Sequence, residues 1–247
     1  MLIGILSDIH ANREAFDAAL EAISRAGAQR IVLLGDLVGY GPDPSYIVEK
    51  ARALIESGAV GILGNHDEAA ATGNTSGMSE NARDAIRWTI DQLSADQCEF
   101  LAKLPLSHQD GDILYTHAGA WRPHAWPYVK EAADAKRSFE AVPARIAICG
   151  HTHVPAIFYS TARGAVSSFT PLANKPAPLF ATLRSVVVVG AVGQPRDGNP
   201  AACAALLDTD AKTVTMLRIA YDWDETAEKI SRAGLPGWLG MRLKIGR

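Results

Sequence analysis

The stretch Met1-Leu2-Ile3-Gly4-Ile5-Leu6-Ser7-Asp8-Ile9-His10 places a carboxylate and an imidazole directly after an apolar run. An apolar run of this length that ends at polar residues predicts a buried strand over residues 1–6. Later apolar runs end in the same way, at the signatures Gly35-Asp36, Gly64-Asn65-His66-Asp67, Thr116-His117 and Gly150-His151-Thr152-His153. Oxygen and imidazole groups at the ends of successive strands can converge on one edge of a sheet.

The segments between these signatures alternate between strand and helix patterns. Residues 12–26 are predicted to form a helix, because Phe16, Leu20 and Ile23 recur at helical spacing and Gly27 follows. Strands are predicted at 31–34 and 59–63, and a helix at 45–56. This alternation predicts right-handed parallel crossovers, with ligands bound beyond the carboxyl ends of the strands.

The second half of the chain is richer in strand patterns. A helical region at 79–104, made of one or two helices, ends at Pro105, and short strands at 113–115 and 145–149 precede His117 and His151. Further strands are predicted at 156–159, 181–189, 201–207 and 214–219, with loops at 68–80, 118–130 and 161–180. We therefore expect a second sheet packed on the first within a single domain of residues 1–247, in which residues 222–247 form a C-terminal helical tail.

Composition limits the class of protein. The 247 residues are 48% hydrophobic and 21% charged, which is usual for a globular protein. The net charge of −3 argues against a dedicated nucleic-acid-binding surface, and no stretch has the length of a membrane span. The cysteines Cys98, Cys149 and Cys203 favour a reducing compartment over a disulfide framework, so we expect a cytoplasmic protein. The sequence does not determine its oligomeric state.

Residues of the signatures are candidate metal ligands: Asp8, His10, Asp36, Asn65, His117, His151 and His153. Carboxylates and imidazoles without a thiolate suit divalent Mn, Fe, Ni or Zn. This ligand set is too large for one ion and fits two ions that share a carboxylate, which would hold them roughly 3.5–4 Å apart. Asp36 is the candidate for that bridge. In an extended His151-Thr152-His153 segment, alternate side chains share a face at different heights, so each histidine could serve a different ion.

His66 is the candidate proton donor. The adjacent Asn65 would fix the loop on the metal and leave the His66 imidazole aimed at the substrate. A histidine whose pKa is close to about 6.5 can donate a proton to a leaving alkoxide near neutral pH. Taken singly, these motifs have structural explanations, since a strand-end aspartate often caps a helix and Gly-Asn-His-Asp favours a turn. The joint pattern favours a metal site; His108 and His124 fall outside it and are expected at the surface.

In their order along the chain, these signatures over residues 1–155 resemble the calcineurin-like metallophosphoesterase superfamily. The resemblance implies an α/β fold, a four-layer α/β/β/α sandwich of two mixed sheets with flanking helices. It assigns one metal ion to Asp8, His10, Asp36 and His153, and the other to Asp36, Asn65, His117 and His151. It further implies that a metal-bridging hydroxide attacks phosphorus in line and that His66 acts as general acid.

One departure from the family pattern bears on the substrate. The Ser/Thr protein phosphatases, and the related symmetrical dinucleoside-tetraphosphate hydrolases, carry an arginine shortly after this aspartate that clamps phosphate. Here Gly39-Tyr40 stand where the Asp-Arg pair of the protein phosphatases would lie. A bidentate guanidinium for a phosphate dianion is therefore missing at that place. The carboxylate that would orient His66 is missing too, and Asp67 is the candidate substitute. This difference favours a phosphodiesterase.

The runs at 38–42 and 193–198 look like those of a bacterial and archaeal subgroup of compact phosphodiesterases. Several members of that subgroup are regarded as phosphatases or diadenosine-polyphosphate hydrolases. Candidate substrate contacts beyond the metal ligands are Arg13, Tyr40, Arg122 and Arg196, each with the alternative of being a solvated or packing residue. The aromatic and basic loop 121–126 could stack a nucleobase, or its aromatic side chains could anchor the loop.

We therefore expect a two-metal phosphodiesterase that hydrolyses a small or nucleotide-derived phosphate ester. The alternatives are a phosphomonoesterase or protein phosphatase, and a diadenosine-polyphosphate hydrolase. A non-catalytic metal-binding scaffold is disfavoured because a scaffold has no chemical need for a general acid. A nuclease is disfavoured by the acidic balance of the chain.

Overall fold

The computed structural model describes residues 1–161 and 163–247, and in them the strands form two six-stranded sheets. The order in the first sheet is β3 (Val60–Gly61), β2 (Arg30–Leu33), β1 (Leu2–Leu6), β11 (Ala202–Asp208), β12 (Thr213–Ile219) and β9 (Pro176–Pro178). The order in the second is β4 (Ser107–Asp110), β5 (Ile113–Thr116), β6 (Ile146–Cys149), β10 (Arg184–Val188), β7 (Ala156–Ser160) and β8 (Val166–Phe169). Strands β1, β2 and β3 are parallel, as are β5, β6 and β10, and the other neighbours are antiparallel.

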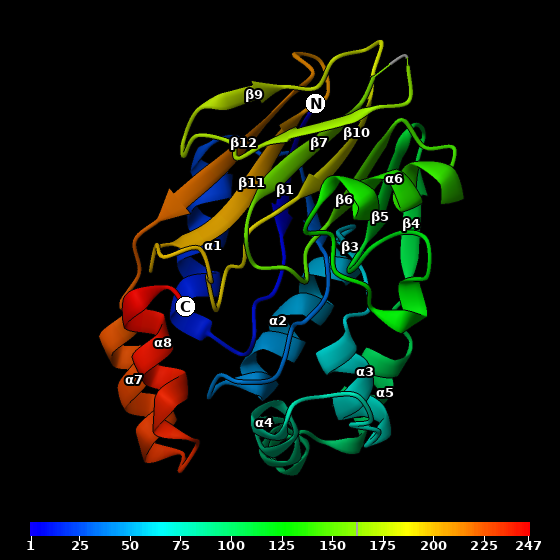
Figure 1. Ribbon diagram of the computed structural model, residues 1–247. Helices are drawn as coiled ribbons and strands as arrows, with labels where there is room; N and C mark the ends of the chain where they lie inside the picture. Colours follow the sequence, from blue (N-terminus) through cyan, green and yellow to red (C-terminus); the bar gives the residue numbers. More distant parts are fainter. Residues whose placement is uncertain (162) are drawn as a thin grey trace.

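Helices cover the outer faces of both sheets (Figure 1). The helices in chain order are α1 (Arg13–Arg25), α2 (Pro44–Glu56), α3 (Asn65–Thr72), α4 (Glu80–Gln92), α5 (Ala95–Ala102), the short 3₁₀ helix η1 (Pro123–Ala125), α6 (Ala132–Ala141), α7 (Trp223–Arg232) and α8 (Gly237–Ile245). Helix α1 contacts β1, β11 and β12 of the first sheet, whereas α6 contacts β7, β8 and β10 of the second. Across residues 1–161 and 163–247, none of the helices has both the length and the apolar character needed to cross a membrane.

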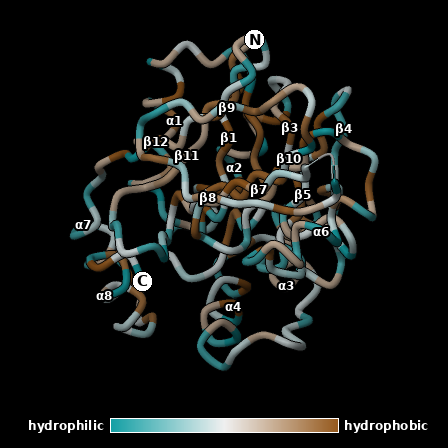
Figure 2. The backbone as a smooth tube through the Cα atoms, turned by 45° about the horizontal axis from the view of Figure 1, so that its top comes forward, coloured by the Kyte–Doolittle hydropathy of each residue, from teal (hydrophilic) through white to brown (hydrophobic). Residues whose placement is uncertain are grey.

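The alternating side chains of β1 separate two layers of the core. Ile3 and Ile5 pack between the two sheets with residues of β6 and β10, whereas Leu6 packs with Phe16 between the first sheet and its helices. A third core lies between the second sheet and α6, around Phe139. Figure 2 shows the hydrophobic strands in the interior and hydrophilic segments among the outer elements. The layers are helix, sheet, sheet and helix, which confirms the four-layer sandwich.

Several elements differ from the sequence-based expectation. Residues 65–72 form helix α3, where a turn and a loop were expected; Asp67 Oδ2 accepts a hydrogen bond from the Gly64 amide and so caps the helix. The region at 79–104 is two helices, because Ser94 and Gln97 form a capping box that starts α5. Helix α6 and strands β4, β8 and β9 were not predicted. Strands β4 and β8 contain mainly polar residues, and β9 contains two prolines, which suits its position at a sheet edge.

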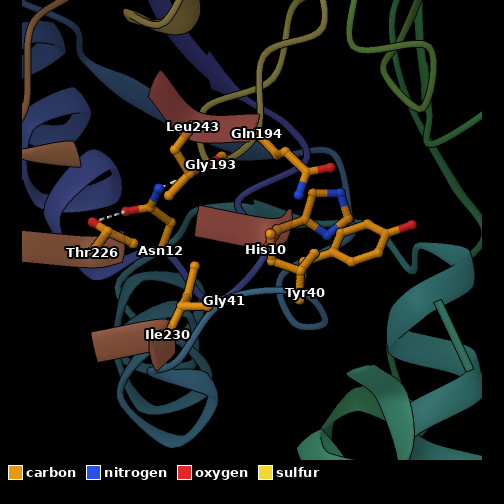
Figure 3. Close-up of a pocket in the computed structure, with 10 residues that line it drawn as sticks. His10, Asn12, Tyr40, Gly41, Gly193, Gln194, Thr226, Ile230 and Leu243 are labelled. Atoms are coloured by element: carbon orange, nitrogen blue, oxygen red, sulfur yellow. Dashed lines mark hydrogen bonds between the residues drawn. The ribbon is translucent and has the colours of Figure 1, made fainter. Parts of the chain in front are cut away.

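The C-terminal helices α7 and α8 are attached to the start of α1. Asn12 Oδ1 accepts a hydrogen bond from Thr226 Oγ1 at 3.1 Å, at the bottom of a small cavity of about 10 Å³ (Figure 3). Lys229 Nζ donates to Glu14 Oε1 at 2.6 Å and to Asp43 Oδ2 at 2.8 Å. An apolar cluster joins these helices to α4 and contains Tyr40, Ala82, Ala85, Ile230, Leu235, Leu239 and Leu243. The tail is therefore packed against the loop that holds Tyr40.

Candidate metal centre

The candidate ligands all lie just beyond the carboxyl ends of parallel strands. Asp8 and His10 follow β1, Asp36 follows β2, and Asn65 begins α3 shortly after β3. On the second sheet, His117 follows β5, and His151 and His153 follow β6. Asn65 is half-buried and the others are buried. The structure thus brings together every ligand that the sequence signatures predicted.

One group of ligand atoms is centred on the Nε2 atoms of His10 and His153, which lie 3.3 Å apart. Asp8 Oδ1 lies 3.1 Å from His153 Nε2 and 3.9 Å from His10 Nε2. Asp36 Oδ2 lies 3.8 Å from His10 Nε2. Atoms that bind one divalent ion at about 2.1 Å lie about 3 Å or more from each other. The spacing of this group is therefore compatible with one divalent ion.

A second group is centred on His117 Nε2. This atom lies 3.2 Å from His151 Nδ1, 3.3 Å from Asn65 Oδ1 and 3.3 Å from Asp36 Oδ2. Asp36 Oδ2 is thus near both groups, at 3.8 Å from His10 Nε2 and 3.3 Å from His117 Nε2. One carboxylate oxygen shared by two ligand groups is the geometry of a bridging ligand.

The hydrogen bonds of the Asp8 carboxylate show whether the site suits a cation. Asp8 Oδ2 accepts hydrogen bonds from Ser7 Oγ at 2.7 Å and from the His151 amide at 3.0 Å. Asp8 Oδ1 is buried and has no hydrogen-bond partner in the described residues. A buried carboxylate oxygen without a partner is costly unless a cation or a hydrogen-bond donor compensates it. This oxygen faces His153 Nε2, so the residues present fit a divalent metal ion.

Main-chain carbonyl groups orient the histidines of the site. The Nδ1 atoms of His10, His117 and His153 lie 3.2, 2.7 and 2.6 Å from the carbonyl oxygens of Val38, Leu34 and Gln194, respectively. A proton on Nδ1 that is donated to a carbonyl leaves the lone pair of Nε2 free. In each of these histidines Nε2 is the atom that faces the ligand groups.

The ligand loops hold an unusual backbone conformation. Five ligands have φ between 49° and 63°, in the left-handed region that residues other than glycine seldom adopt: Asp8, His10, Asp36, His151 and His153. The prediction of an extended His151-Thr152-His153 segment is therefore wrong, because the chain bends at both histidines. They nevertheless serve different groups, with His153 beside Asp8 and His151 beside His117.

The charges of the metal-free site are set by burial and by the two aspartates. Burial opposes ionisation of Asp36, but His117 and His66 hold its pKa well below the usual value. Burial also opposes a charge on His117, yet the Asp36 carboxylate raises the pKa of that imidazole to about 9. Burial and the neighbouring His117 lower the pKa of His151 to about 3. The Asp36 carboxylate therefore favours positive charge at this place, which a bound cation would also supply.

His66 lies beside the ligand groups and packs against Gly39. A Cβ atom at Gly39, where φ is +86°, would lie 2.4 Å from His66 Nδ1. That nitrogen is buried without a hydrogen-bond partner among the described residues. Burial lowers the pKa of His66 to about 4, below the value near 6.5 that was expected. The imidazole is therefore neutral at neutral pH in the metal-free chain.

Asp67 makes no hydrogen bond to the His66 imidazole in the described residues, so the suggestion that its carboxylate orients that ring directly is wrong. Its Oδ1 accepts from the Val38 amide at 3.1 Å and its Oδ2 from the Gly64 amide at 3.0 Å. Burial and the nearby Asp36 raise the pKa of this carboxyl to about 7. Asp67 therefore joins the loop after β2 to the start of α3, and it positions Asn65 and His66 through the backbone.

A cavity of about 530 Å³ opens onto Asn65, His66 and His151. Tyr40 and Arg196, two of the predicted substrate contacts, line it. The Tyr40 ring lies 4.7 Å from the His10 ring and 4.5 Å from the His66 ring. The geometry therefore gives Tyr40 and Arg196 access to a ligand in the cavity.

The other two predicted contacts lie elsewhere. Arg13 pairs with Asp17 and covers the Tyr46 ring, on the outer side of α1. Arg122 is exposed and is not among the residues that line the cavity. The suggestion that Arg13 and Arg122 face the substrate is not supported by these positions.

The aromatic loop after β5 is divided between two roles. Trp126 lines the cavity and donates from Nε1 to Glu68 Oε2 at 3.1 Å. Trp121 packs beside the core around Phe139, with the Arg137 guanidinium 5.9 Å from its ring. Tyr128, which the sequence analysis did not select, stacks on His151 at 4.2 Å between ring centroids.

Trp238 and Arg242 of α8 also line the cavity and were not predicted. They lie about 200 positions after the loop they approach, and no local signature marks them. From the sequence they were placed only within the expected C-terminal helical tail of residues 222–247.

Residues 1–212 match the family model for the calcineurin-like phosphoesterase superfamily domain. The chain belongs to this superfamily. A metallophosphoesterase from Sphaerobacter thermophilus has a TM-score of 0.88 and 37% identity, covering 100% of this chain and 99% of that one. An uncharacterised protein of Methanocaldococcus jannaschii is 31% identical over 252 residues, covering 100% of this chain and 98% of that protein. The phosphodiesterase YfcE of Escherichia coli K12 is 24% identical over 225 residues, covering 88% and 92% of the two chains.

These comparisons confirm the superfamily and the α/β fold that the sequence signatures implied. The calcineurin-like phosphoesterases are hydrolases, and this chain is a metal-dependent phosphoester hydrolase. The His and Asp groups at the sheet edges could hold the metal that this chemistry requires.

Proposed function

We propose that this protein is a phosphodiesterase that hydrolyses a small or nucleotide-derived phosphodiester at a centre of two divalent metal ions. One ion would be held by Asp8, His10, Asp36 and His153, and the other by Asp36, Asn65, His117 and His151. The observation that carries the proposal is the position of Asp36 Oδ2, near both His10 Nε2 and His117 Nε2. The donor set suits Mn, Fe, Ni or Zn.

The protein's own residues would place and protonate the substrate. When bound, the two ions supply charge stabilisation to the phosphoryl group and lower the pKa of a water molecule. His66 would donate a proton to the leaving oxygen. An anionic phosphate beside the imidazole raises its pKa above the metal-free value of about 4, toward the range in which it can act as an acid.

The preference for a diester rests on Gly39 and Tyr40. The phenol ring of Tyr40 lies against His10 and His66, in the part of the sequence where the protein phosphatases carry a guanidinium. A phosphate monoester dianion needs more positive charge than a diester monoanion. The lack of a guanidinium from this loop therefore supports a diester substrate over a monoester.

We infer further that residues 1–247 act as one domain in the cytoplasm. The tail packs on α1 and α4 through Lys229, Thr226 and the cluster around Tyr40. Cys98, Cys149 and Cys203 are all free thiols, which suits a reducing compartment. The partner we propose is a small-molecule phosphate ester.

The test compares bis-p-nitrophenyl phosphate with p-nitrophenyl phosphate on protein loaded with Mn²⁺, Ni²⁺, Zn²⁺ or Mg²⁺. The metal content of each sample is measured by mass spectrometry. We expect two ions per chain and a higher kcat/KM for the diester. Faster monoester cleavage would make the protein a phosphomonoesterase, and no hydrolysis of either compound with any metal would refute the proposal.

A further inference from the structure

Arg196 and Arg242 bring two guanidinium groups to one cavity from distant parts of the chain. Arg196 follows the loop whose Gln194 carbonyl holds His153, and Arg242 lies on α8. Both residues line the cavity that also exposes Asn65, His66 and His151. Both are half-buried, so their charges are less screened than those of exposed arginines.

No Asp or Glu side chain in residues 1–161 and 163–247 lies within 4.0 Å of either guanidinium. Arg196 Nη2 donates to the neutral amide oxygen of Gln194 at 2.9 Å, and Arg196 Nε is buried without a partner. Asp197, the neighbouring residue, pairs instead with Arg218. Arg242 Nε donates to the terminal main-chain oxygen of Arg247, which balances part of its charge.

Arg196 and Arg242 also act on each other electrostatically. Burial lowers the pKa of Arg242, and the positive charge of Arg196 lowers it further. Two like charges that face one cavity repel each other, and an anion bound between them removes that repulsion. A guanidinium presents a planar set of donors that matches the oxygens of a phosphate group.

Arg242 contacts aromatic rings beside the metal ligands. The Arg242 guanidinium lies 5.3 Å from the Trp238 ring, whose centroid is 6.4 Å from that of Tyr40. The Tyr40 ring in turn lies 4.7 Å from His10, and the Arg196 guanidinium lies 5.7 Å from Tyr40. In the described residues Arg242 has its ring contact with Trp238 and its hydrogen bond with Arg247, neither of them a metal ligand, so an anion beside it can be a different group from the phosphate at the metal ligands.

We propose that Arg196 and Arg242 form a second anion subsite, which binds a further phosphate group of the substrate while the scissile phosphate lies at the metal ligands. The substrate class is then a phosphate ester or anhydride with two phosphate groups. The inference rests on the proposed function for the role of the metal ligands. The family model ends at residue 212, so Arg242 lies outside the matched region.

The fixed position of α8 supports this assignment. Helix α7 is held on α1 by the contacts of Lys229 and Thr226, and Leu239 and Leu243 of α8 are buried in the cluster that contains Tyr40. Arg242 lies between these two buried positions on the helix. It is therefore delivered to the cavity by packed structure, as specific recognition requires.

The experiment measures binding of methylenebisphosphonate, which has two phosphonate groups, and of methylphosphonate, which has one. Isothermal titration calorimetry is run on metal-free protein, and inhibition of bis-p-nitrophenyl phosphate hydrolysis is measured on metal-loaded protein. The variants are Arg242→Gln, Arg242→Lys and the control Lys244→Gln. Lys244 carries the same charge on the same helix, but it is exposed and lies over Trp223.

We expect Arg242→Gln to weaken methylenebisphosphonate binding about tenfold or more in both assays, and to weaken inhibition of the metal-loaded enzyme by methylphosphonate less than twofold, because that ligand then occupies the metal ions. Arg242→Lys should recover part of the loss, and Lys244→Gln should bind as the wild type does. Wild-type methylenebisphosphonate affinity in Arg242→Gln, an equal loss in Lys244→Gln, or an equal loss of methylphosphonate inhibition in the metal-loaded enzyme would overturn the inference. Thermal melts identify any variant that fails to fold, and Arg242→Lys then serves as the test.

The calorimetric and kinetic measurements distinguish a failure of this inference from a failure of the proposed function. If the wild-type enzyme hydrolyses no diester, the proposed function fails, and the calorimetry on metal-free protein still tests the anion subsite. If hydrolysis is normal but Arg242→Gln binds both phosphonates as the wild type does, only the subsite fails.

Discussion

The main-chain amide of His66 donates a 2.8 Å hydrogen bond to Asp36 Oδ1, the oxygen opposite the one that both ligand groups approach. The proposed bridging carboxylate and the proposed acid are thus held together by one contact. Gly64 permits it, because a Cβ atom there would lie 2.1 Å from the Asp36 amide and 2.3 Å from Asp36 Oδ1. A change at Asp36 therefore affects the metal ions and the position of His66 together.

Asp36→Asn should remove both metal ions and lower kcat/KM by at least about 100-fold. The reason is that loss of even a supporting group around a metal costs about 10–100-fold, and Asp36 is a shared ligand. Metal content by mass spectrometry and diester kinetics check this outcome. The control is Asp84→Asn, on the exposed side of α4. Retention of one full equivalent of metal would argue against a bridging carboxylate.

His66→Gln should leave the metal content unchanged and lower kcat by about 10²–10⁴-fold for a diester with an alkyl leaving group. The loss should be much smaller for a p-nitrophenyl leaving group, because that phenolate departs without a proton. The measurement compares the loss of kcat in His66→Gln for the alkyl diester with the loss for the p-nitrophenyl diester. Equal losses for both leaving groups would show that His66 has another role.

Gly39→Ala should displace His66 and lower kcat about tenfold or more while the metal ions remain bound, because the added methyl group has no room beside Nδ1. The matched control is Gly27→Ala. Gly27 has nearly the same backbone conformation, with φ +84° against +86°, and nothing lies within 4 Å of its added Cβ. Both variants should lose about 1 kcal/mol of stability, from the left-handed backbone. Comparable kcat values in the two variants would contradict the role of Gly39.

Removal of the two metal ions should lower the melting temperature by roughly 10–20 °C. Each ion at about 100 times its dissociation constant stabilises the folded chain by about 2.7 kcal/mol, and each kcal/mol shifts the melting temperature by roughly 2–4 °C at this size. Differential scanning calorimetry before and after chelation measures the shift. Asp36→Asn should show little further change on chelation, and a full shift in that variant would place the ions elsewhere.

Thiol reactivity should distinguish Cys98 from the other two cysteines. Burial raises the pKa of the Cys149 and Cys203 thiols to about 12, so that only about 10⁻⁴ of each is thiolate at pH 8. Cys98 is half-buried. Titration with an aromatic disulfide reagent should find at most one reactive thiol in the folded protein and three after denaturation. Rapid reaction of all three without denaturant would contradict the buried positions.

The metal ligands could be predicted from sequence because their signals are local. Each of Asp8, Asp36 and His117 comes within a few residues of an apolar strand, and parallel strands bring their carboxyl ends to the same edge. The same alternation predicted the parallel strands, whereas the four-layer sandwich was implied by the resemblance to the superfamily. Strands β8 and β9 were missed because their apolar pattern is weak, and their place in the sheets depends on pairing with distant strands.

The environment of His66 and the partners of Tyr40 could not be predicted. The pKa of His66 depends on burial by loops that converge only in the folded chain. Asp67 was suggested as the partner of His66, but the helical turn that starts at Asn65 points its carboxylate at main-chain amides instead. Arg242 meets the Tyr40 loop across about 200 positions, a separation over which no sequence pattern constrains side-chain contacts.

The attachment of α7 and α8 has an evolutionary consequence. The ligands of the metal centre all lie before residue 155, whereas Trp238 and Arg242 belong to a helical pair that begins at Trp223. Part of the proposed selectivity is thus encoded apart from the proposed metal ligands. Changes confined to the last two helices could therefore alter the cavity while leaving the proposed metal ligands in place.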